Sequence, residues 1–122
     1  MIETLIIYST TDGQTIKICS KLAKESFNNN VKLCSLKDAN KEDLESFNKV
    51  IIGASIRYGK HNPSLIEFVR KNLNILDSIK TAFFSVNVVA RKKEKNTPLT
   101  NPYVIKFLKQ TKWKPTNIGV FA

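Results

Sequence analysis

Apolar runs alternate with amphipathic stretches along the whole chain. Residues 4–9 form a short run of apolar and β-branched side chains without an internal charge, and residues 49–55 and 81–90 repeat this pattern. Such runs are typical of strands in a parallel sheet that is covered on both faces. Residues 31–36 alternate in polarity as a half-buried strand does, and residues 117–122 predict a last strand.

Helices are predicted in the intervals between these strands. Residues 14–27 place apolar side chains at helical spacing with lysines on the opposite side, and residues 40–47 predict a short helix capped by Asn40. Two further helices, over residues 63–73 and 102–110, each begin with proline directly after an asparagine. Asparagine is a preferred N-cap and proline a preferred first helical residue, so these two starts are well defined.

Strands that alternate with helices predict a parallel sheet with right-handed crossovers and helices on both faces. Five strands are too few for a barrel of eight strands, and we expect a flavodoxin-like, doubly wound α/β fold with strand order 2-1-3-4-5. The chain is expected to be a single domain over residues 1–122 that is incomplete at the C-terminus, with its last helix missing. Ile118, Val120 and Phe121 would then lie exposed on the last strand, which predicts possible self-association.

The composition is that of one globular domain and excludes several other classes. The 122 residues are 42% hydrophobic and 25% charged, which is sufficient for a continuous core. No apolar run approaches the roughly 18 residues of a spanning helix, and we expect a soluble, cytoplasmic protein. Cys19, Cys34 and the single histidine form no cluster, so no metal site is expected and both cysteines are predicted to be reduced core thiols.

The positive charge belongs to the second half of the chain. Residues 1–56 carry seven lysines and seven acidic residues, whereas residues 57–122 carry thirteen lysines and arginines against three acidic residues. The second half therefore accounts for the whole net charge of +10, which indicates an anionic partner such as a membrane surface, a polyanion or an acidic small molecule. A solvated lysine-rich surface is the alternative. Nucleic acid is not expected, because aromatic residues are not interleaved with the lysines.

Three loops are candidates for a site, because ligands of doubly wound sheets bind beyond the carboxyl ends of the strands. The loop after the first strand is rich in hydroxyls and enters a helix N-terminus, which suits a single phosphate monoester. In the alternative interpretation, Asp12 or Thr11 only caps the helix and Gly13 only makes the turn. Neither a glycine-rich dinucleotide motif nor a nucleoside-triphosphate motif is present.

The other two loops suit a flat ligand. Tyr58 and Arg57 follow the third strand and can stack on an aromatic ring. Asn87 interrupts the fourth apolar run and either bonds a ring edge or is a satisfied amide within the sheet. His61 is expected to be an exposed neighbour of the ligand. Because no carboxylate pair and no Ser/His/Asp or Cys/His set is assembled, no catalytic side chain is expected, and redox chemistry supplied by a cofactor is the chemistry that fits.

Three loop sequences in this order resemble the bacterial, flavodoxin-like family of quinone-dependent protoporphyrinogen oxidases: STTDGQT at residues 9–15, IGASIRYG at residues 52–59 and SVNVVARKKEKNTPLTN at residues 85–101. The resemblance implies FMN-dependent oxidation of protoporphyrinogen IX to protoporphyrin IX in haem biosynthesis. It also implies menaquinone or ubiquinone as the acceptor, at the inner face of the cell membrane. The family's C-terminal insertion and final helix are absent from this sequence, so a generic FMN electron carrier or quinone reductase and an inactive truncated remnant are the alternatives.

The resemblance further implies a set of site residues. The FMN phosphate would lie on Thr10, Thr11, Asp12, Gly13, Gln14 and Thr15. The isoalloxazine would lie between two segments, which contribute Ser55, Ile56, Arg57, Tyr58 and Gly59, and Ser85, Val86, Asn87, Val88 and Arg91. Cations for the substrate's propionates or for anionic lipid headgroups would come from the two arginines and from Lys60, Lys92, Lys93 and Lys95.

Overall fold

The strands form one parallel sheet in the order β2-β1-β3-β4-β5, which confirms the predicted topology. They are β1 (Glu3–Ser9), β2 (Asn30–Ser35), β3 (Lys49–Ser55), β4 (Lys80–Val86) and β5 (Asn117–Phe121). The structure is a computed structural model. It describes residues 3–9, 16–18, 21, 30–39, 44–56 and 61–121, and of residues 3, 30, 88 and 89 the backbone alone.

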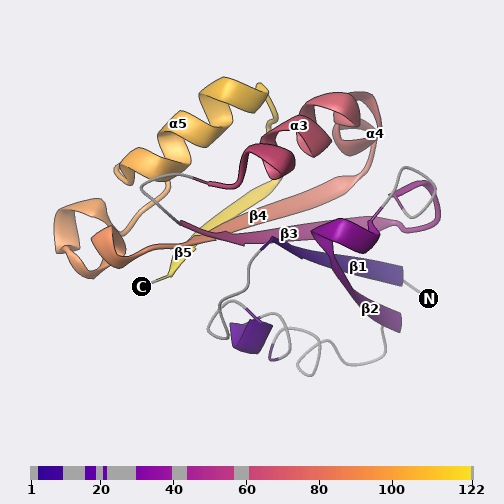
Figure 1. The fold of residues 1–122 in the computed structure, drawn as a ribbon, viewed down its shortest axis with the longest axis horizontal. Coiled ribbons are helices and arrows are strands. Elements are labelled where there is room, and N and C mark those ends of the chain that lie inside the picture. The colour runs from indigo at the N-terminus through magenta and orange to yellow at the C-terminus, as the bar shows by residue number, and fades with distance from the viewer. Residues whose placement is uncertain are drawn as a thin grey trace.

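Three α-helices cover one face of the sheet (Figure 1). They are α3 (Pro63–Lys71), α4 (Leu73–Ser78) and α5 (Pro102–Thr111), and short 3-10 helices occur at η1 (Leu36–Asp38), η2 (Val88–Arg91) and η3 (Lys93–Lys95). On the opposite face, residues 16–18 are helical. They belong to the helix predicted over residues 14–27, most of which lies outside the described residues. Ile16, an apolar residue of that predicted helix, is 38% exposed.

Two asparagines begin α3 and α5 as predicted. The Asn62 side chain accepts a hydrogen bond from the Ser64 N–H at 2.8 Å. The Asn101 side chain accepts from the N–H groups of Tyr103 and Val104. Each cap satisfies N–H groups that have no partner within the helix, and the following proline adds none. The caps therefore define where both helices start.

The predicted helix over residues 63–73 is wrong at its C-terminal end, where the chain forms two helices. Asn72 ends α3, because its backbone N–H bonds the carbonyl oxygens of Phe68 and Val69 and its side chain also donates to Phe68. The Asn72 carbonyl oxygen then accepts from Ile75 and Leu76 and begins α4. Asn72 thus ends one helix and begins the next, although the helical spacing of apolar residues continues across it.

The fourth strand is shorter than the predicted residues 81–90. It ends at Val86. The Asn87 N–H still donates to the Phe121 carbonyl oxygen of β5 at 2.9 Å, but the Asn87 side chain accepts from the Ala90 N–H at 3.1 Å and turns the chain into η2. A side chain that hydrogen-bonds the backbone a few residues later favours a turn over continued strand pairing, and at Asn87 the turn forms.

The main core lies between the sheet and the three helices. Phe83 of β4 stacks on Phe107 of α5 with centroids 4.5 Å apart, and Trp113 packs edge-on against Phe83 at 5.8 Å. Ile118 and Val120 of β5 also pack against this core and are half-buried. The expectation that they lie exposed is therefore wrong, because side chains alternate along a strand and these two point to the covered face.

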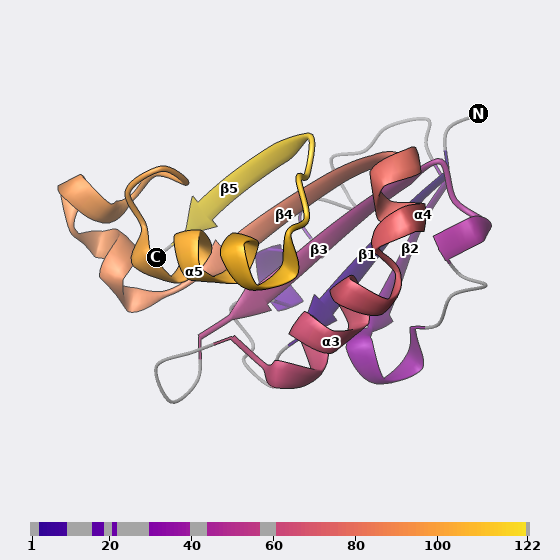
Figure 2. The same ribbon diagram turned by 90° about the horizontal axis from the view of Figure 1, so that it is seen from above.

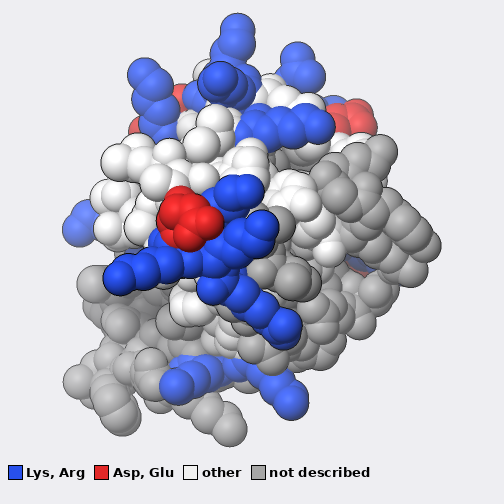
Figure 3. Space-filling view, turned by 90° about the vertical axis from the view of Figure 1, so that its left-hand side faces the viewer, with Lys and Arg blue, Asp and Glu red and all other residues white. Residues whose placement is uncertain are grey.

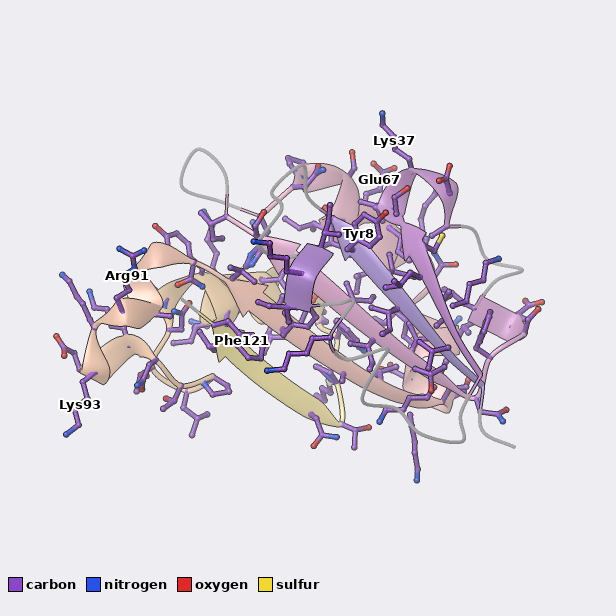
Figure 4. All side chains as sticks on the ribbon, turned by 90° about the horizontal axis from the view of Figure 1, so that it is seen from below. Tyr8, Lys37, Glu67, Arg91, Lys93 and Phe121 are labelled. Atoms are coloured by element: carbon purple, nitrogen blue, oxygen red, sulfur yellow. The ribbon has the colours of Figure 1, made fainter. Side chains whose placement is uncertain are left out.

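The opposite face holds a smaller cluster around Ile6 and Phe84. The Phe84 ring lies over Gly53 of the neighbouring strand, and the Phe121 ring meets it edge-on at 5.5 Å. Phe121 is 40% exposed, in agreement with the sequence expectation, and Figure 4 views this face. Cys34 is a buried, reduced thiol as predicted. Within the described ranges, no helix has the length and apolar character required to cross a membrane.

Candidate functional site

The carboxyl ends of β1, β3 and β4 lie level with one another at one edge of the sheet. Ser9 of β1 is in register with Ala54 of β3, and Ala54 is in register with Ser85 of β4. The strand order reverses between β1 and β3, which is where ligands of doubly wound sheets bind. Figure 2 shows the segment after β4 extending beyond this edge. The row of three strand ends is therefore the candidate site.

The loop after β1 lies outside the described residues, and its predicted contacts stay predictions: Thr10, Thr11, Asp12, Gly13, Gln14 and Thr15. Ser9, directly before this loop, is 5% exposed, and its Oγ has no hydrogen-bond partner among the groups that the structure describes. A buried hydroxyl without a partner costs about 1–3 kcal/mol. A ligand oxygen at this edge would remove that cost. Sequence reasoning placed Ser9 in the loop and left it out of the site.

The loop after β3 is described only at its start. Ser55 and Ile56 are half-buried, and the Ile56 N–H donates to the Val86 carbonyl oxygen at 3.1 Å. The end of β3 is thus fixed against the end of β4. The other predicted residues of this loop lie outside the described ranges: Arg57, Tyr58, Gly59 and Lys60.

The loop after β4 brings its predicted residues to the same edge, with different exposures. Ser85 is fully buried, and Val86 and Asn87 are 6% and 4% exposed. Arg91 lies on the surface at the end of η2, and for Val88 the backbone alone is described. The side chains of Ser85 and Asn87 therefore face the protein interior, and only the later residues of this loop present side chains to solvent.

His61 is buried, and the expectation of an exposed neighbour of the ligand is wrong. Its side chain is 4% exposed, and Nε2 lies 2.9 Å from Ser85 Oγ. The rings of Phe83 and Phe107 pack edge-on against the imidazole at 5.7 and 5.1 Å. Burial lowers the pKa of His61 from 6.5 to about 4, because the apolar surroundings disfavour the charged form. The imidazole is therefore neutral at physiological pH.

Asn87 and Asn101 form a reciprocal pair of side-chain amides. Asn101 Nδ2 donates to Asn87 Oδ1 at 2.9 Å, and Asn87 Nδ2 donates to Asn101 Oδ1 at 3.3 Å. Asn87 also donates to Ser85 Oγ at 2.9 Å and accepts from the Ala90 N–H. These four bonds use the whole hydrogen-bonding capacity of its amide. The sequence left open whether the Asn87 amide bonds a ligand ring or is satisfied within the protein. The structure shows the satisfied amide, which has no donor or acceptor left for a ring edge.

The Ser85 hydroxyl links Asn87 to His61. Its Oγ accepts a hydrogen bond from Asn87, and its own proton is available to His61 Nε2. Because a hydroxyl has a second lone pair, Oγ can also accept from a protonated Nε2, and the hydrogen bonds alone fit either state of the ring. The lowered pKa keeps the imidazole neutral, and Nε2 can then accept the Ser85 proton. Although His61 and Ser85 lie at the distance of a base and a nucleophile, the full burial of Ser85 excludes it from attacking a substrate.

Positive charge gathers at this end of the molecule (Figure 3). Arg91, Lys92 and Lys93 are exposed, Lys95 is half-exposed, and Glu94 is the acidic residue among them. Figure 4 shows Arg91 and Lys93 projecting from the segment after β4. Leu99 follows in the same segment and is 89% exposed. The described residues contain no group of three or more side chains that would hold a metal ion.

Sequence reasoning missed the polar network, although one signal was available. Ser85 and Asn87 interrupt an apolar strand two positions apart, and residues two apart share one face of a strand. Two polar side chains on one buried face must find partners. The sequence predicted Asn101 as a helix cap only, whereas in the structure it both caps α5 and bonds the Asn87 side chain.

Comparisons with known proteins agree with the predicted fold and with the family that the sequence resembles. Residues 5–122 match the family described as "Flavodoxin domain". The chain is 43% identical to protoporphyrinogen IX dehydrogenase (quinone) of Escherichia coli strain K12, over 98% of this chain and 67% of that protein.

Solved structures of low identity show the same fold. The two-electron reduced flavodoxin of Megasphaera elsdenii aligns with a TM-score of 0.73 at 14% identity, over 97% of this chain and 85% of that one. A flavoprotein of Lactobacillus acidophilus in complex with FMN aligns with a TM-score of 0.66 at 16% identity, over 98% and 93% of the two chains.

Proposed function

Because the chain belongs to the flavodoxin domain family and shares 43% identity with a protoporphyrinogen IX dehydrogenase (quinone), we propose that it oxidises protoporphyrinogen IX to protoporphyrin IX in haem biosynthesis. The electron acceptor is a membrane quinone, either menaquinone or ubiquinone. The observation that carries this proposal is that the alignment, at 43% identity, covers 98% of the chain and therefore spans the segments after β1, β3 and β4.

The proposed cofactor is one non-covalently bound FMN. When bound, FMN supplies two-electron chemistry, so that three rounds remove six hydrogens from one porphyrinogen and reduce three quinones to quinols. The loop of Thr10 to Thr15 offers one phosphate site, which suits FMN better than a dinucleotide. The ring would lie between the segments that begin at Ile56 and Val86, whose backbones are bonded to each other.

Ser9 supports a phosphate at this edge. Its buried Oγ lacks a protein partner in the described part of the chain and stands directly before the proposed phosphate loop. A hydroxyl is a donor that a phosphate oxygen readily accepts from. The residues present at this edge therefore fit the cofactor, and we add Ser9 to the phosphate-binding residues.

The protein's own contribution to the reaction is binding and orientation. No side chain acts as a nucleophile in this proposal. Arg91, Lys92 and Lys93 provide cations beside the carboxyl edge, where they suit the propionate groups of a porphyrinogen. Arg57 and Lys60 lie in the adjoining loop and are proposed to contribute in the same way.

We also propose that this end of the molecule contacts the inner face of the cell membrane peripherally. A membrane quinone requires the site to approach the bilayer, and anionic headgroups attract basic segments by about 1 kcal/mol per lysine or arginine. Leu99, which is 89% exposed in the same segment, is an apolar side chain that such a surface would cover.

An anaerobic assay with purified FMN-loaded chain tests this function. The reaction is started with protoporphyrinogen IX and a soluble menaquinone analogue, and protoporphyrin IX is followed by its fluorescence. We expect a rate proportional to both the chain concentration and the quinone concentration.

The flavodoxin neighbours favour a second candidate, an FMN electron carrier or quinone reductase. That candidate predicts quinone reduction by an artificial donor without porphyrin formation, and an inactive remnant predicts neither.

A further inference from the structure

The end of β4 is the centre of a buried network of four side chains that joins three parts of the chain. Ser85 contacts His61, which precedes α3, and Asn87 contacts Asn101, which begins α5. These pairs are 24 and 14 positions apart in the sequence. All four side chains are less than 5% exposed. A fully satisfied network of this kind holds its members in one arrangement, since any displacement leaves a buried polar group without a partner.

The end of β4 holds both residues that flank segment 57–60. Ile56 before it donates its backbone N–H to the Val86 carbonyl oxygen at 3.1 Å. His61 after it belongs to the network, bonds Ser85 at 2.9 Å and packs edge-on against the stacked rings of Phe83 and Phe107. Consecutive residues of β4 therefore hold the last residue before this segment and the first residue after it.

The network also fixes the basic segment after β4. Asn101 Nδ2 donates to the Lys95 carbonyl oxygen at 2.9 Å, and the Asn101 N–H donates to the Thr97 carbonyl oxygen at 2.8 Å. Asn87 Oδ1 accepts from the Ala90 N–H at the start of the same segment. The segment is thus bonded near its beginning, its middle and its end to two asparagines that also bond each other.

We propose that His61, Ser85, Asn87 and Asn101 are positioning residues that hold the end of β4, the residues that flank segment 57–60 and the basic segment after β4 in the arrangement that binds the flavin. This inference rests on the proposed function, and none of the four side chains need touch the cofactor. The network acts by fixing the end of β4 on both sides of Val86, whose carbonyl oxygen bonds Ile56, and by bonding the Lys95 carbonyl oxygen in the segment after β4. A shift of about 1 Å in such a position is sufficient to change function by orders of magnitude.

A pair of substitutions at His61 tests the hydrogen bond apart from the volume of the side chain. His61→Leu fills a similar space without a polar atom, whereas His61→Gln retains an amide that can bond Ser85. We expect His61→Leu to raise the Kd for FMN by about tenfold, and His61→Gln to stay within about threefold of the parent chain. Kd is measured by titration of the apoprotein with FMN and quenching of the flavin fluorescence.

Thr111→Val is the matched control for lost stability. Thr111 Oγ is buried in α5, donates to the Phe107 carbonyl oxygen and accepts from the Trp113 N–H, and it takes no part in the network. Its loss should lower the melting temperature and leave the Kd for FMN unchanged. Ser85→Ala provides the same test as His61→Leu if that variant does not fold.

The outcomes separate this inference from the proposed function. If the parent chain does not bind FMN, the proposed function fails. If the parent chain binds FMN and His61→Leu and Ser85→Ala bind it equally well, the positioning role is refuted. Equal weakening in His61→Gln and His61→Leu also refutes it, because the hydrogen bond would then not be the feature that matters. Rescue by glutamine alone supports the proposal.

Discussion

Burial of His61 predicts that the stability of the protein falls between neutral and mildly acidic pH. The pKa of His61 is lowered from 6.5 to about 4 by burial, so between these values the unfolded chain binds a proton that the folded chain does not bind. Stability therefore decreases as the pH falls through this window, and the loss is complete below pH 4. The two pKa values give a maximum loss of about 3 kcal/mol, of which about 2 kcal/mol is reached between pH 7 and pH 5.

His61→Gln removes this proton and provides the comparison. Carboxylates titrate in both proteins, so their contribution cancels when the free energies of unfolding are subtracted. Urea denaturation at pH 7 and pH 5 should show that the parent chain loses about 2 kcal/mol more than the variant. Because His61 is the single histidine, NMR titration of its imidazole measures the folded pKa directly. An NMR value near 6.5, or equal losses in both proteins, would contradict the burial and the neutral network.

Three further predictions address packing, capping and charge. Gly53→Ala places a methyl group within the Phe84 ring and should lower the free energy of unfolding in urea by about 1–3 kcal/mol. Gly119→Ala, whose added methyl group lies 3.5 Å from the nearest atom of the Phe121 ring, should lower it less, and equal losses would exclude the steric explanation. Asn101→Ala removes a helix cap and leaves the Asn87 amide short of a partner, so it should lower the free energy of unfolding by more than about 2 kcal/mol. Asn62→Ala, at an exposed cap, should lower it by about 1 kcal/mol in the same assay, and the reverse order would contradict the role of Asn101 in the network. The double variant Lys92→Glu and Lys93→Glu should release the chain from anionic vesicles in a sedimentation assay. Lys37→Glu in η1 should not release it, and equal release would argue against a membrane contact through the segment after β4.

The parallel sheet could be predicted from local patterns because its central strands β1, β3 and β4 are largely buried on both faces. The apolar run of residues 49–55 coincides with β3 at both ends, and the Asn-Pro pairs at Asn62 and Asn101 mark the starts of α3 and α5. In these places, the local preference of the residues and the tertiary structure agree.

The misassigned positions are those where one side chain bonds a residue distant in the sequence or serves two elements. Asn87 ends β4 through its side-chain bond to the Ala90 N–H and also bonds Asn101, and Asn72 separates α3 from α4. His61 precedes a helix cap and has the local sequence of a surface residue, yet Ser85 and two aromatic rings bury it. Partners such as these are set by the crossing of elements, which hydrophobic periodicity does not describe.

Hydrogen exchange measured with and without FMN tests whether FMN binds at the carboxyl edge of the sheet. We predict slower exchange in peptides that cover residues 9–15, 55–60 and 85–91, which follow the three strand ends that lie level with one another. Peptides from β2, at the far side of the strand-order reversal, should exchange at unchanged rates. Protection that appears elsewhere, or no protection at saturating FMN, would show that FMN does not bind at this edge.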